Sequence, residues 1–202
     1  MSENIKFVGY PRTGNQLLLS RIWNLCDVPE GTPYESFLYT VHDHDHDLSL
    51  DLKQPVVYIC RNPLEVVYSR SMADERWHTQ NKEWKKRKTI LFRMQEYRDH
   101  LDKFYRSPNL IVTYKKLVNE PLQTMRQVLG FSGFKNGTIE DLKSSIEKED
   151  KQSVIDRLSP INPHFYDQYL LHELYHQRRQ EFIEKQKNRF LDFFKDYPEL
   201  FE

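Results

Sequence analysis

Apolar residues gather in short continuous runs, and each run is followed by a segment whose apolar residues recur every three or four positions. The continuous runs predict buried strands at residues 5–8, 36–41, 55–60 and 109–113. The spaced segments predict helices at residues 15–25, 64–73, 80–105 and 121–129. Gly130 is expected to end the last of these helices, and Thr138 opens a capping box for the next one. Beyond Pro160 and Pro163 the pattern predicts helix as far as Phe194.

The alternation of strands and helices indicates an α/β protein. Each connection between predicted strands is long enough for a crossover, which favours a mainly parallel sheet with helices on both faces. We therefore expect a three-layer α/β/α fold like that of P-loop NTPases, with a helical C-terminal third. No repeat, low-complexity segment or linker divides the sequence, so residues 1–202 are predicted to form one domain with its helical part at 138–202.

The composition limits where the protein acts and what it binds. Lysine plus arginine (30) balance aspartate plus glutamate (30), so no net field attracts nucleic acid or an anionic membrane, and any anion site is local. No apolar run approaches the roughly 20 residues that cross a bilayer, and the N-terminus lacks a signal-peptide pattern. Cys26 and Cys60 lie in apolar stretches, as reduced core cysteines do. We expect a cytoplasmic protein with no nucleic-acid or membrane partner.

The junction between the first predicted strand and helix has the glycine spacing of a phosphate-binding loop. Gly9 and Gly14 are spaced as in a Walker loop, so backbone N–H groups and the helix N-terminus would converge on one anion. Asn15 and Gln16 stand where that loop has lysine and a hydroxyl residue, which argues against hydrolysis of Mg²⁺-bound ATP or GTP. Arg12 is the one cation within the turn and could neutralise an oxyanion without metal. The glycine pair alone also fits a plain strand–turn–helix junction.

A second anion site is expected at the end of the third predicted strand. Ligands of open parallel sheets bind beyond the carboxyl ends of the strands, and Arg61 directly follows the strand at 55–60. Ser69 comes later, about two turns into the next helix. Arg61 could hold a phosphate there, with a hydrogen bond from Ser69 if the helix folds back over the strand. Taken alone, an arginine beside a strand is usually a surface charge.

Three segments together resemble the sulfotransferase superfamily. Tyr-Pro-Arg-Thr-Gly-Asn-Gln-Leu at residues 10–17 is similar to the family's 5′-phosphosulfate loop, Tyr-Pro-Lys-Ser-Gly-Thr-Thr-Trp. Residues 57–69 resemble its 3′-phosphate segment, with the same spacing from arginine to serine. Residues 110–121 resemble its block Arg-Tyr-Glu-Asp-Leu followed by Asp-Pro. The order and spacing of the three segments within residues 5–134 are far more specific than any one of them.

The resemblance implies a donor, 3′-phosphoadenosine-5′-phosphosulfate (PAPS), a product, 3′-phosphoadenosine-5′-phosphate (PAP), and no metal. Arg61 and Ser69 would bind the 3′-phosphate, and Tyr114 would lie near the adenine. The phosphosulfate would be held by residues of the first loop, namely Pro11, Arg12, Thr13, Gly14, Asn15 and Gln16. Arg12 would also act in catalysis, because charge grows on the oxygens while a sulfuryl group moves to a hydroxyl or amine.

The acceptor hydroxyl needs a general base, and a histidine near its ordinary pKa suits neutral pH. Many family members carry Lys-x-His between the two phosphate segments, and Thr40-Val41-His42 stands in that place without the lysine. His42 is therefore the predicted base, and His44 is the alternative. In an extended segment His42, His44 and His46 would face one side and could bind a divalent metal. Such alternating runs are more often solvated loops, so we predict no metal site.

The sequence departs from the family pattern in two further respects. Leu17 replaces the tryptophan that stacks on the adenine. Residues 135–202 contain no match to the late Arg-Lys-Gly and Gly-Asp-Trp segments that close over the nucleotide. Lys151 and Arg157 are the candidates to replace those late charges.

Several alternatives stay open. His172-Glu173-Leu174-Tyr175-His176 matches the His-Glu-x-x-His zinc signature, but no third ligand is recognisable, and two histidines on one helix face are common by chance. The loop at residues 9–14 also fits a kinase-like enzyme acting on a nucleotide or small metabolite, or a protein that binds PAP without transferring anything. The basic run at residues 82–88 is a solvated helix face or attracts an anionic acceptor. We favour a sulfotransferase with a small-molecule or carbohydrate acceptor, and the sequence predicts neither that acceptor's identity nor the oligomeric state.

Overall fold

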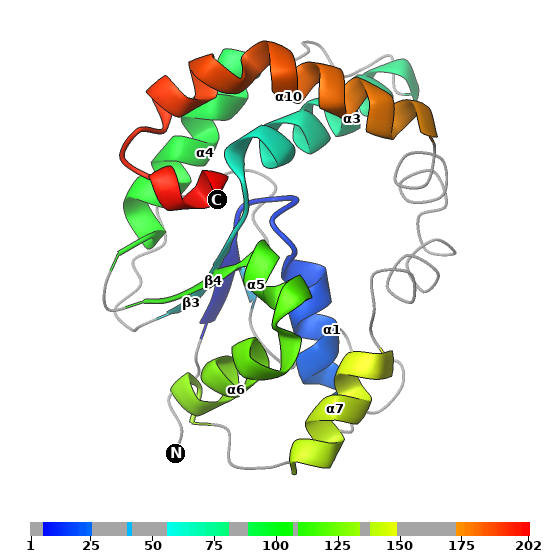
Figure 1. Cartoon of the computed structure of the whole chain (residues 1–202), viewed down its shortest axis with the longest axis vertical. Helices are drawn as coiled ribbons and strands as arrows, with labels where there is room; N and C mark the ends of the chain where they lie inside the picture. The colour runs from blue at the N-terminus through cyan, green and yellow to red at the C-terminus, as the bar shows by residue number, and fades with distance from the viewer. Residues whose placement is uncertain are drawn as a thin grey trace.

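The computed structural model describes residues 6–25, 40–41, 56–80, 89–106, 109–133, 138–148 and 173–202. At its centre lies a four-stranded parallel sheet with the strand order β2-β1-β3-β4 (Figure 1). The strands are β1 (Lys6–Gly9), β2 (Thr40–Val41), β3 (Val56–Cys60) and β4 (Leu110–Thr113). The parallel sheet predicted from the sequence is confirmed, and Ser36 to Tyr39 of the second predicted strand lie outside the described residues.

The helices follow the strands in the predicted alternation. They are α1 (Asn15–Leu25), α3 (Pro63–Gln80), α4 (Ile90–Phe104), α5 (Tyr114–Asn119), α6 (Pro121–Phe131), α7 (Ile139–Lys148) and α10 (Glu173–Phe193), with a final 3₁₀ turn η1 (Pro198–Phe201). Within the part of the chain that the structure describes, no helix is long and apolar enough to span a bilayer.

β3 shows that the sheet is covered on both faces. All its residues are buried, and their side chains alternate between two separate cores. Val57 and Ile59 pack with α1, α5, α6 and α7. Val56, Tyr58 and Cys60 pack with α3, α4 and the chain's last residues from α10 onward. The predicted three-layer α/β/α arrangement is therefore confirmed.

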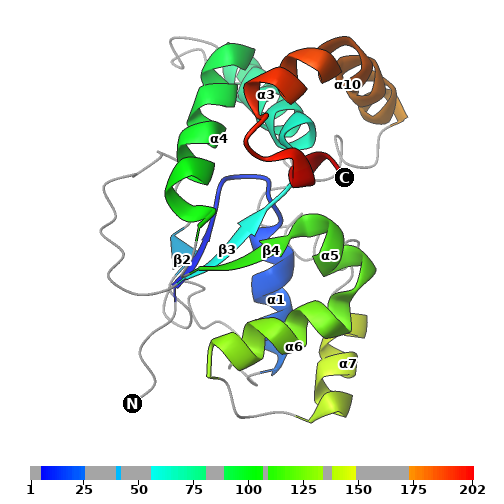
Figure 2. The same cartoon turned by 60° about the vertical axis from the view of Figure 1, so that its left-hand side comes forward.

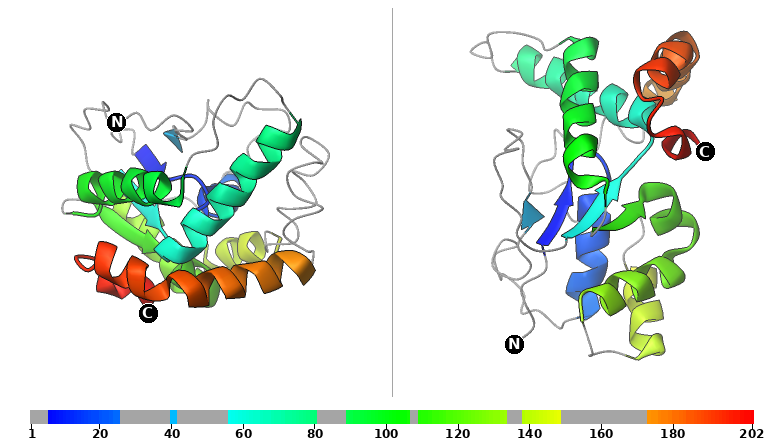
Figure 3. Two further views of the ribbon diagram at one scale, coloured as in Figure 1. Left: turned by 90° about the horizontal axis from the view of Figure 1, so that it is seen from above. Right: turned by 90° about the vertical axis from the view of Figure 1, so that its left-hand side faces the viewer.

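α3 lies beyond the edge of the sheet at which the parallel strands end. It starts directly after β3 and packs against α4 and α10 above the strands (Figures 1 and 2). Seen from above, α3 runs obliquely across the molecule away from the end of β3 (Figure 3). The helix thus extends beyond the end of β3 and does not fold back alongside it, so a hydrogen bond from Ser69 to a phosphate at Arg61 would be made from beyond the strand end.

The single helix predicted over residues 80–105 is wrong. α3 continues to Gln80, and a separate helix, α4, begins at Ile90. Thr89 adopts an extended conformation with ψ 158°, and its hydroxyl accepts a hydrogen bond from the amide of Phe92 at 3.1 Å. This threonine is therefore an N-cap, and its side chain satisfies a donor that the first turn leaves open.

The end of α6 also differs from the prediction, whereas the start of α7 agrees with it. Gly130 lies inside α6, and the turn comes at Gly133, whose φ is +66°. Glycine tolerates this left-handed conformation, so the second glycine ends the helix. At α7 the Thr138 hydroxyl accepts from the Asp141 amide at 3.1 Å, and the Asp141 carboxylate accepts from the Thr138 amide at 2.7 Å. This reciprocal pair confirms the predicted capping box.

Candidate functional site

The loop after β1 is a tight turn with a strained residue at its centre. The amide and the hydroxyl of Thr13 both donate to the carbonyl of Tyr10, at 3.2 and 2.7 Å. Arg12 has φ +78° and Gly14 has φ +109°. The left-handed conformation is ordinary for glycine but costs an arginine about 1–3 kcal/mol. Residues held in this way concentrate at functional sites, so the backbone singles out the residue that the sequence predicted to meet an anion.

Asn15 closes this loop against the strand. Its Nδ2 donates to the carbonyl of Gly9 at 2.9 Å, and a Cβ at Gly9 would lie 2.0 Å from its Oδ1, so no side chain fits there. The first helical bond of α1 runs from the Leu18 amide to the Gly14 carbonyl. The amides that precede it, including those of Asn15 and Gln16, form the helix N-terminus beside Arg12. The Asn15 side chain therefore shapes the loop, while its backbone belongs to the predicted cradle.

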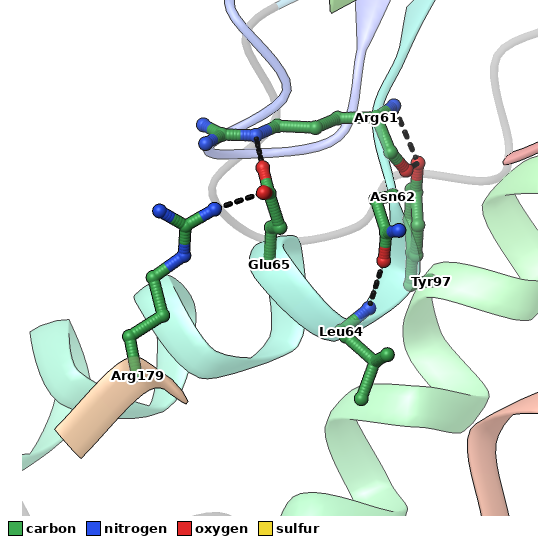
Figure 4. Close-up of polar contacts among 6 residues, drawn as sticks. All are labelled: Arg61, Asn62, Leu64, Glu65, Tyr97 and Arg179. Atoms are coloured by element: carbon green, nitrogen blue, oxygen red, sulfur yellow. Dashed lines mark hydrogen bonds and ion pairs between the residues drawn. The ribbon is translucent and has the colours of Figure 1, made fainter. Parts of the chain in front are cut away.

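Arg61 follows β3, and a buried tyrosine fixes its backbone. The hydroxyl of Tyr97, on α4, accepts from the Arg61 amide at 3.0 Å and donates to the Arg61 carbonyl at 2.7 Å (Figure 4). The next residue, Asn62, accepts from the Leu64 amide at 3.0 Å and so starts α3. Burial raises the pKa of the Tyr97 phenol well above its usual value, which keeps the hydroxyl protonated and able to donate.

Tyr114 joins the two predicted anion segments. Its ring lies 4.2 Å below the Arg61 guanidinium carbon, in a cation–π contact. The same ring packs over Gly14, where a Cβ would lie 2.4 Å from the Tyr114 Cδ2. Residues from the first loop, from the end of β3 and from the start of α5 therefore meet at one place, and the sequence had predicted all three for the donor site.

Glu65 is a site residue to which the sequence interpretation gave no role. One carboxylate oxygen accepts from Arg61 Nε at 2.5 Å, and the other accepts from Arg179 on α10 (Figure 4). The spacing of four residues between Arg61 and Glu65 was a visible signal for this pair. Arg179 could not be placed, because it lies 114 residues from Glu65 in the sequence.

Ser69 lies one turn beyond Glu65 on the same face of α3 and is half-buried. It is thus on the side of the helix that carries the contact to Arg61. Its role toward a 3′-phosphate stays a prediction.

Behind the first loop, Tyr10 belongs to a buried polar cluster on α4. Its hydroxyl donates to Glu96 at 3.2 Å, and Glu96 also accepts from Arg93 at 2.5 Å. Burial, followed by the nearby Glu96 charge, raises the pKa of Tyr10, so the phenol stays neutral. Burial also raises the pKa of the Cys60 thiol at the end of β3. This cysteine is therefore a core residue and no thiolate nucleophile.

Other predicted residues lie outside the described part of the chain. They are His42, His44, His46, Lys151, Arg157 and His172. His176 of the His-Glu-x-x-His segment is described, and it is exposed on α10. Among the residues that the structure describes, no three histidine, cysteine, aspartate or glutamate side chains are grouped as a metal would require.

Comparison with known proteins identifies the family. The mouse sulfotransferase SULT7A1, solved in complex with PAP, has a similar structure with a TM-score of 0.58 at 14% sequence identity. The similarity covers 93% of this chain and 86% of that one. No curated protein sequence matches the chain. The family model described as the sulfotransferase domain matches residues 35–200, which is most of the sequence. This chain therefore belongs to the sulfotransferase family.

Proposed function

We propose that this chain transfers a sulfuryl group from PAPS to a hydroxyl or amine of a small-molecule or carbohydrate acceptor. The observation that carries the proposal is the contact of Tyr114 with both Gly14 and Arg61, which joins the first loop to the end of β3. Two anion-binding segments at one edge of the sheet suit a nucleotide with phosphates at its 5′ and 3′ positions. The PAP in the similar mouse structure supports the same donor.

In the proposed complex the first loop takes the 5′-phosphosulfate. Arg12 supplies the positive charge, and the amides of Gly14, Asn15 and Gln16 complete the cradle. The Thr13 amide and hydroxyl are already bonded to Tyr10, so Thr13 shapes the loop together with the buried Pro11. Arg61 and Ser69 take the 3′-phosphate, and Tyr114, beneath Arg61, lies beside the adenine.

Transfer breaks the bond between sulfur and the bridging oxygen of the donor and forms a bond from sulfur to the acceptor oxygen. The acceptor proton passes to a base, and PAP leaves with the electron pair of the broken bond. Negative charge grows on the bridging oxygen, and in this proposal Arg12 balances it without a metal. The left-handed backbone of Arg12 supports this role, because residues in strained conformations concentrate at functional sites.

The base is proposed to be His42, with His44 as the alternative. β2 ends at Val41, which pairs with Val8, the neighbour of Gly9. The chain therefore leaves β2 beside the donor loop, and His42 is the next residue. A positioned base contributes roughly 10²–10⁴ in rate, so His42→Ala should lower kcat by that factor while PAP binding survives. His46→Ala is the matched control, and an active His42→Ala beside an inactive His44→Ala would transfer the role to His44.

Ligand binding tests the proposed donor. Thermal denaturation should show that PAP and PAPS stabilise the protein in the presence of a metal chelator, whereas Mg²⁺-ATP, added in a separate sample without the chelator, should not. A ligand at about 100 times its Kd adds roughly 2.7 kcal/mol to the free energy of unfolding. Arg61→Ala should remove most of this effect, and Arg126→Ala, an exposed arginine on α6, should leave it intact. Stabilisation by Mg²⁺-ATP alone would favour the kinase-like alternative.

We further propose that the reaction takes place in the cytoplasm. The free, buried thiol of Cys60 supports a reducing compartment.

A further inference from the structure

A carboxylate shared by two arginines lies at the end of β3. Glu65 binds Arg61 from the end of the strand and Arg179 from α10, so two cations surround one anion and a net positive charge remains. The side chains of Arg61, Glu65 and Arg179 are 23%, 24% and 26% exposed. They are therefore partly desolvated, which strengthens electrostatic contacts, yet they are still open to a ligand.

The hydrogen bonds leave donors on both arginines. Glu65 accepts one hydrogen bond from Nε of Arg61 and one from a terminal nitrogen of Arg179. Each guanidinium group has further N–H donors that these two bonds do not use. In Figure 4 the terminal nitrogens of Arg61 and the second terminal nitrogen of Arg179 lie on the same side of the Glu65 carboxylate. Tyr114 holds the Arg61 guanidinium from below. Two cationic groups are thus kept close together and directed to one side.

We propose that Arg179 is a further donor-binding residue, which contacts the 3′-phosphate of the nucleotide together with Arg61. The inference rests on the proposed function, because it assigns a second cation to the same phosphate. A phosphate monoester carries about two negative charges at neutral pH. Arg61 paired with Glu65 has no net charge and would balance the phosphate poorly. Arg61 and Arg179 around the single Glu65 carboxylate carry one net positive charge and would balance the phosphate better. Glu65 then sets the distance between the two guanidinium groups.

Arg179 could instead only hold α10 against α3 and make no contact with the ligand. A second arginine makes a contact of that purely structural kind and serves for comparison. Arg98 on α4 donates to the carbonyl of Phe193 and to the carboxylate of Asp196, at the other end of α10. Arg98→Gln therefore loosens the same helix through a residue that is not bonded to Glu65.

Calorimetric titration with PAP and with AMP separates the two roles, because these nucleotides differ only in the 3′-phosphate. Arg179→Gln should weaken PAP binding about tenfold or more and leave AMP binding unchanged. Arg179→Lys should restore part of the preference for PAP. Arg178→Gln, at an exposed neighbour on α10, and Arg98→Gln should keep the preference of the unmodified protein. An equal loss for PAP and AMP in Arg179→Gln would overturn the inference.

The Glu65→Gln background tests whether Arg179 acts directly. Direct contact predicts that Arg179→Gln still lowers the PAP preference in that background, whereas action through Glu65 predicts no further loss and overturns the inference. Failure of the proposed function has a different signature. The unmodified protein would then bind PAP no more tightly than AMP, whatever stands at position 179.

Discussion

The two faces of the sheet are packed by different kinds of side chain. The apolar core toward α1, α5, α6 and α7 is mostly aliphatic, and its buried hydrophobic residues are Phe7, Leu17, Leu18, Leu19, Ile22, Val57, Ile59, Val112, Leu117, Met125, Val128 and Leu142. The face toward α4 and the end of α10 is rich in aromatic rings, including Tyr10, Tyr58, Tyr97, His100, Phe104, Phe190, Phe194 and Tyr197. We call these the aliphatic face and the aromatic face.

The two faces contribute differently: the aliphatic face mainly stabilises the fold, and the aromatic face also positions residues of the candidate site. Aliphatic packing is non-directional, so it stabilises the fold without fixing any one polar group. A buried tyrosine needs a partner for its hydroxyl, and on the aromatic face the hydroxyl of Tyr97 finds its partner at the site. Tyr97 bonds to the backbone of Arg61, and its ring lies 5.0 Å from the ring of Tyr10, which precedes the first loop. The aromatic face therefore connects the two segments that are predicted to bind anions.

The largest effect is expected from the charge buried in the aromatic face. Arg93 is 1% exposed and balances the Glu96 carboxylate. Arg93→Met should lower the free energy of unfolding by about 3–5 kcal/mol, because it leaves a buried negative charge without that balance. Denaturant titration measures the loss, and adding Glu96→Gln should recover part of it. No recovery in the double variant would show that Arg93 matters only through its packing.

A large truncation in the aliphatic face should lower stability and nothing else. Met125 is fully buried on α6. Met125→Ala should reduce the free energy of unfolding by about 2–5 kcal/mol, while the Kd for PAP of the folded protein stays the same. Weaker PAP binding in this variant would break the proposed division between the two faces.

A matched pair of tyrosines sharpens the comparison within the aromatic face. Tyr97→Phe and Tyr58→Phe each remove a buried hydroxyl, and the Tyr58 hydroxyl bonds to His100 Nδ1 at 3.0 Å, not to the site. Each variant should lose about 0.5–1.5 kcal/mol of stability per hydrogen bond. Of the two variants, only Tyr97→Phe should weaken PAP binding, because Tyr97 bonds to the backbone of Arg61 and Tyr58 does not. Equal PAP affinities in the two variants would refute an aligning role for Tyr97.

The smallest effect concerns the cap of α7, at the edge of the aliphatic face. Hydrogen bonds from the amide and then the hydroxyl of Thr138 lower the pKa of the exposed Asp141 carboxyl. A lowered pKa stabilises the fold above the ordinary value of about 4, and this contribution is lost as the pH falls through the folded-state pKa. Asp141→Asn should therefore lower Tm slightly at neutral pH and flatten its fall in acid. Glu140→Gln, in the same turn, is the control.

The sequence predicted the parts of the fold that depend on local pattern. The bounds of α1 and the presence of parallel strands followed from apolar runs and spacing, and Gly9, Gly14 and Arg61 were singled out because their sequence setting is specific. The bond between Arg179 and Glu65 has no local signal, since 114 residues separate its partners. The bonds of the Tyr97 hydroxyl to Arg61 could not be predicted either, because the apolar stripe of a helix does not show which strand end the helix will pack against. Alignment of the site is therefore the less predictable part.

Thr89 illustrates an error of a different kind. The apolar stripe around it continues across the break between α3 and α4, so periodicity alone joined two helices. Its hydroxyl bond to the Phe92 amide is local, and a threonine directly before an apolar run is a known start signal. The start of α4 could therefore have been predicted from Thr89, but the prediction followed the apolar periodicity instead.

The aromatic face also has a consequence for the order of folding. Phe190, Phe194, Tyr197 and Leu200 complete this core, and they come last among the residues that form it. The described helices of the aliphatic face all precede residue 149, so during synthesis that core can close while the other still lacks its C-terminal cover. Until then, among the helices that the structure describes, α3 and α4 alone cover the side of β3 that carries Tyr58 and Cys60. During synthesis the aliphatic core can thus form first, and the packing that fixes the geometry around Arg61 forms last.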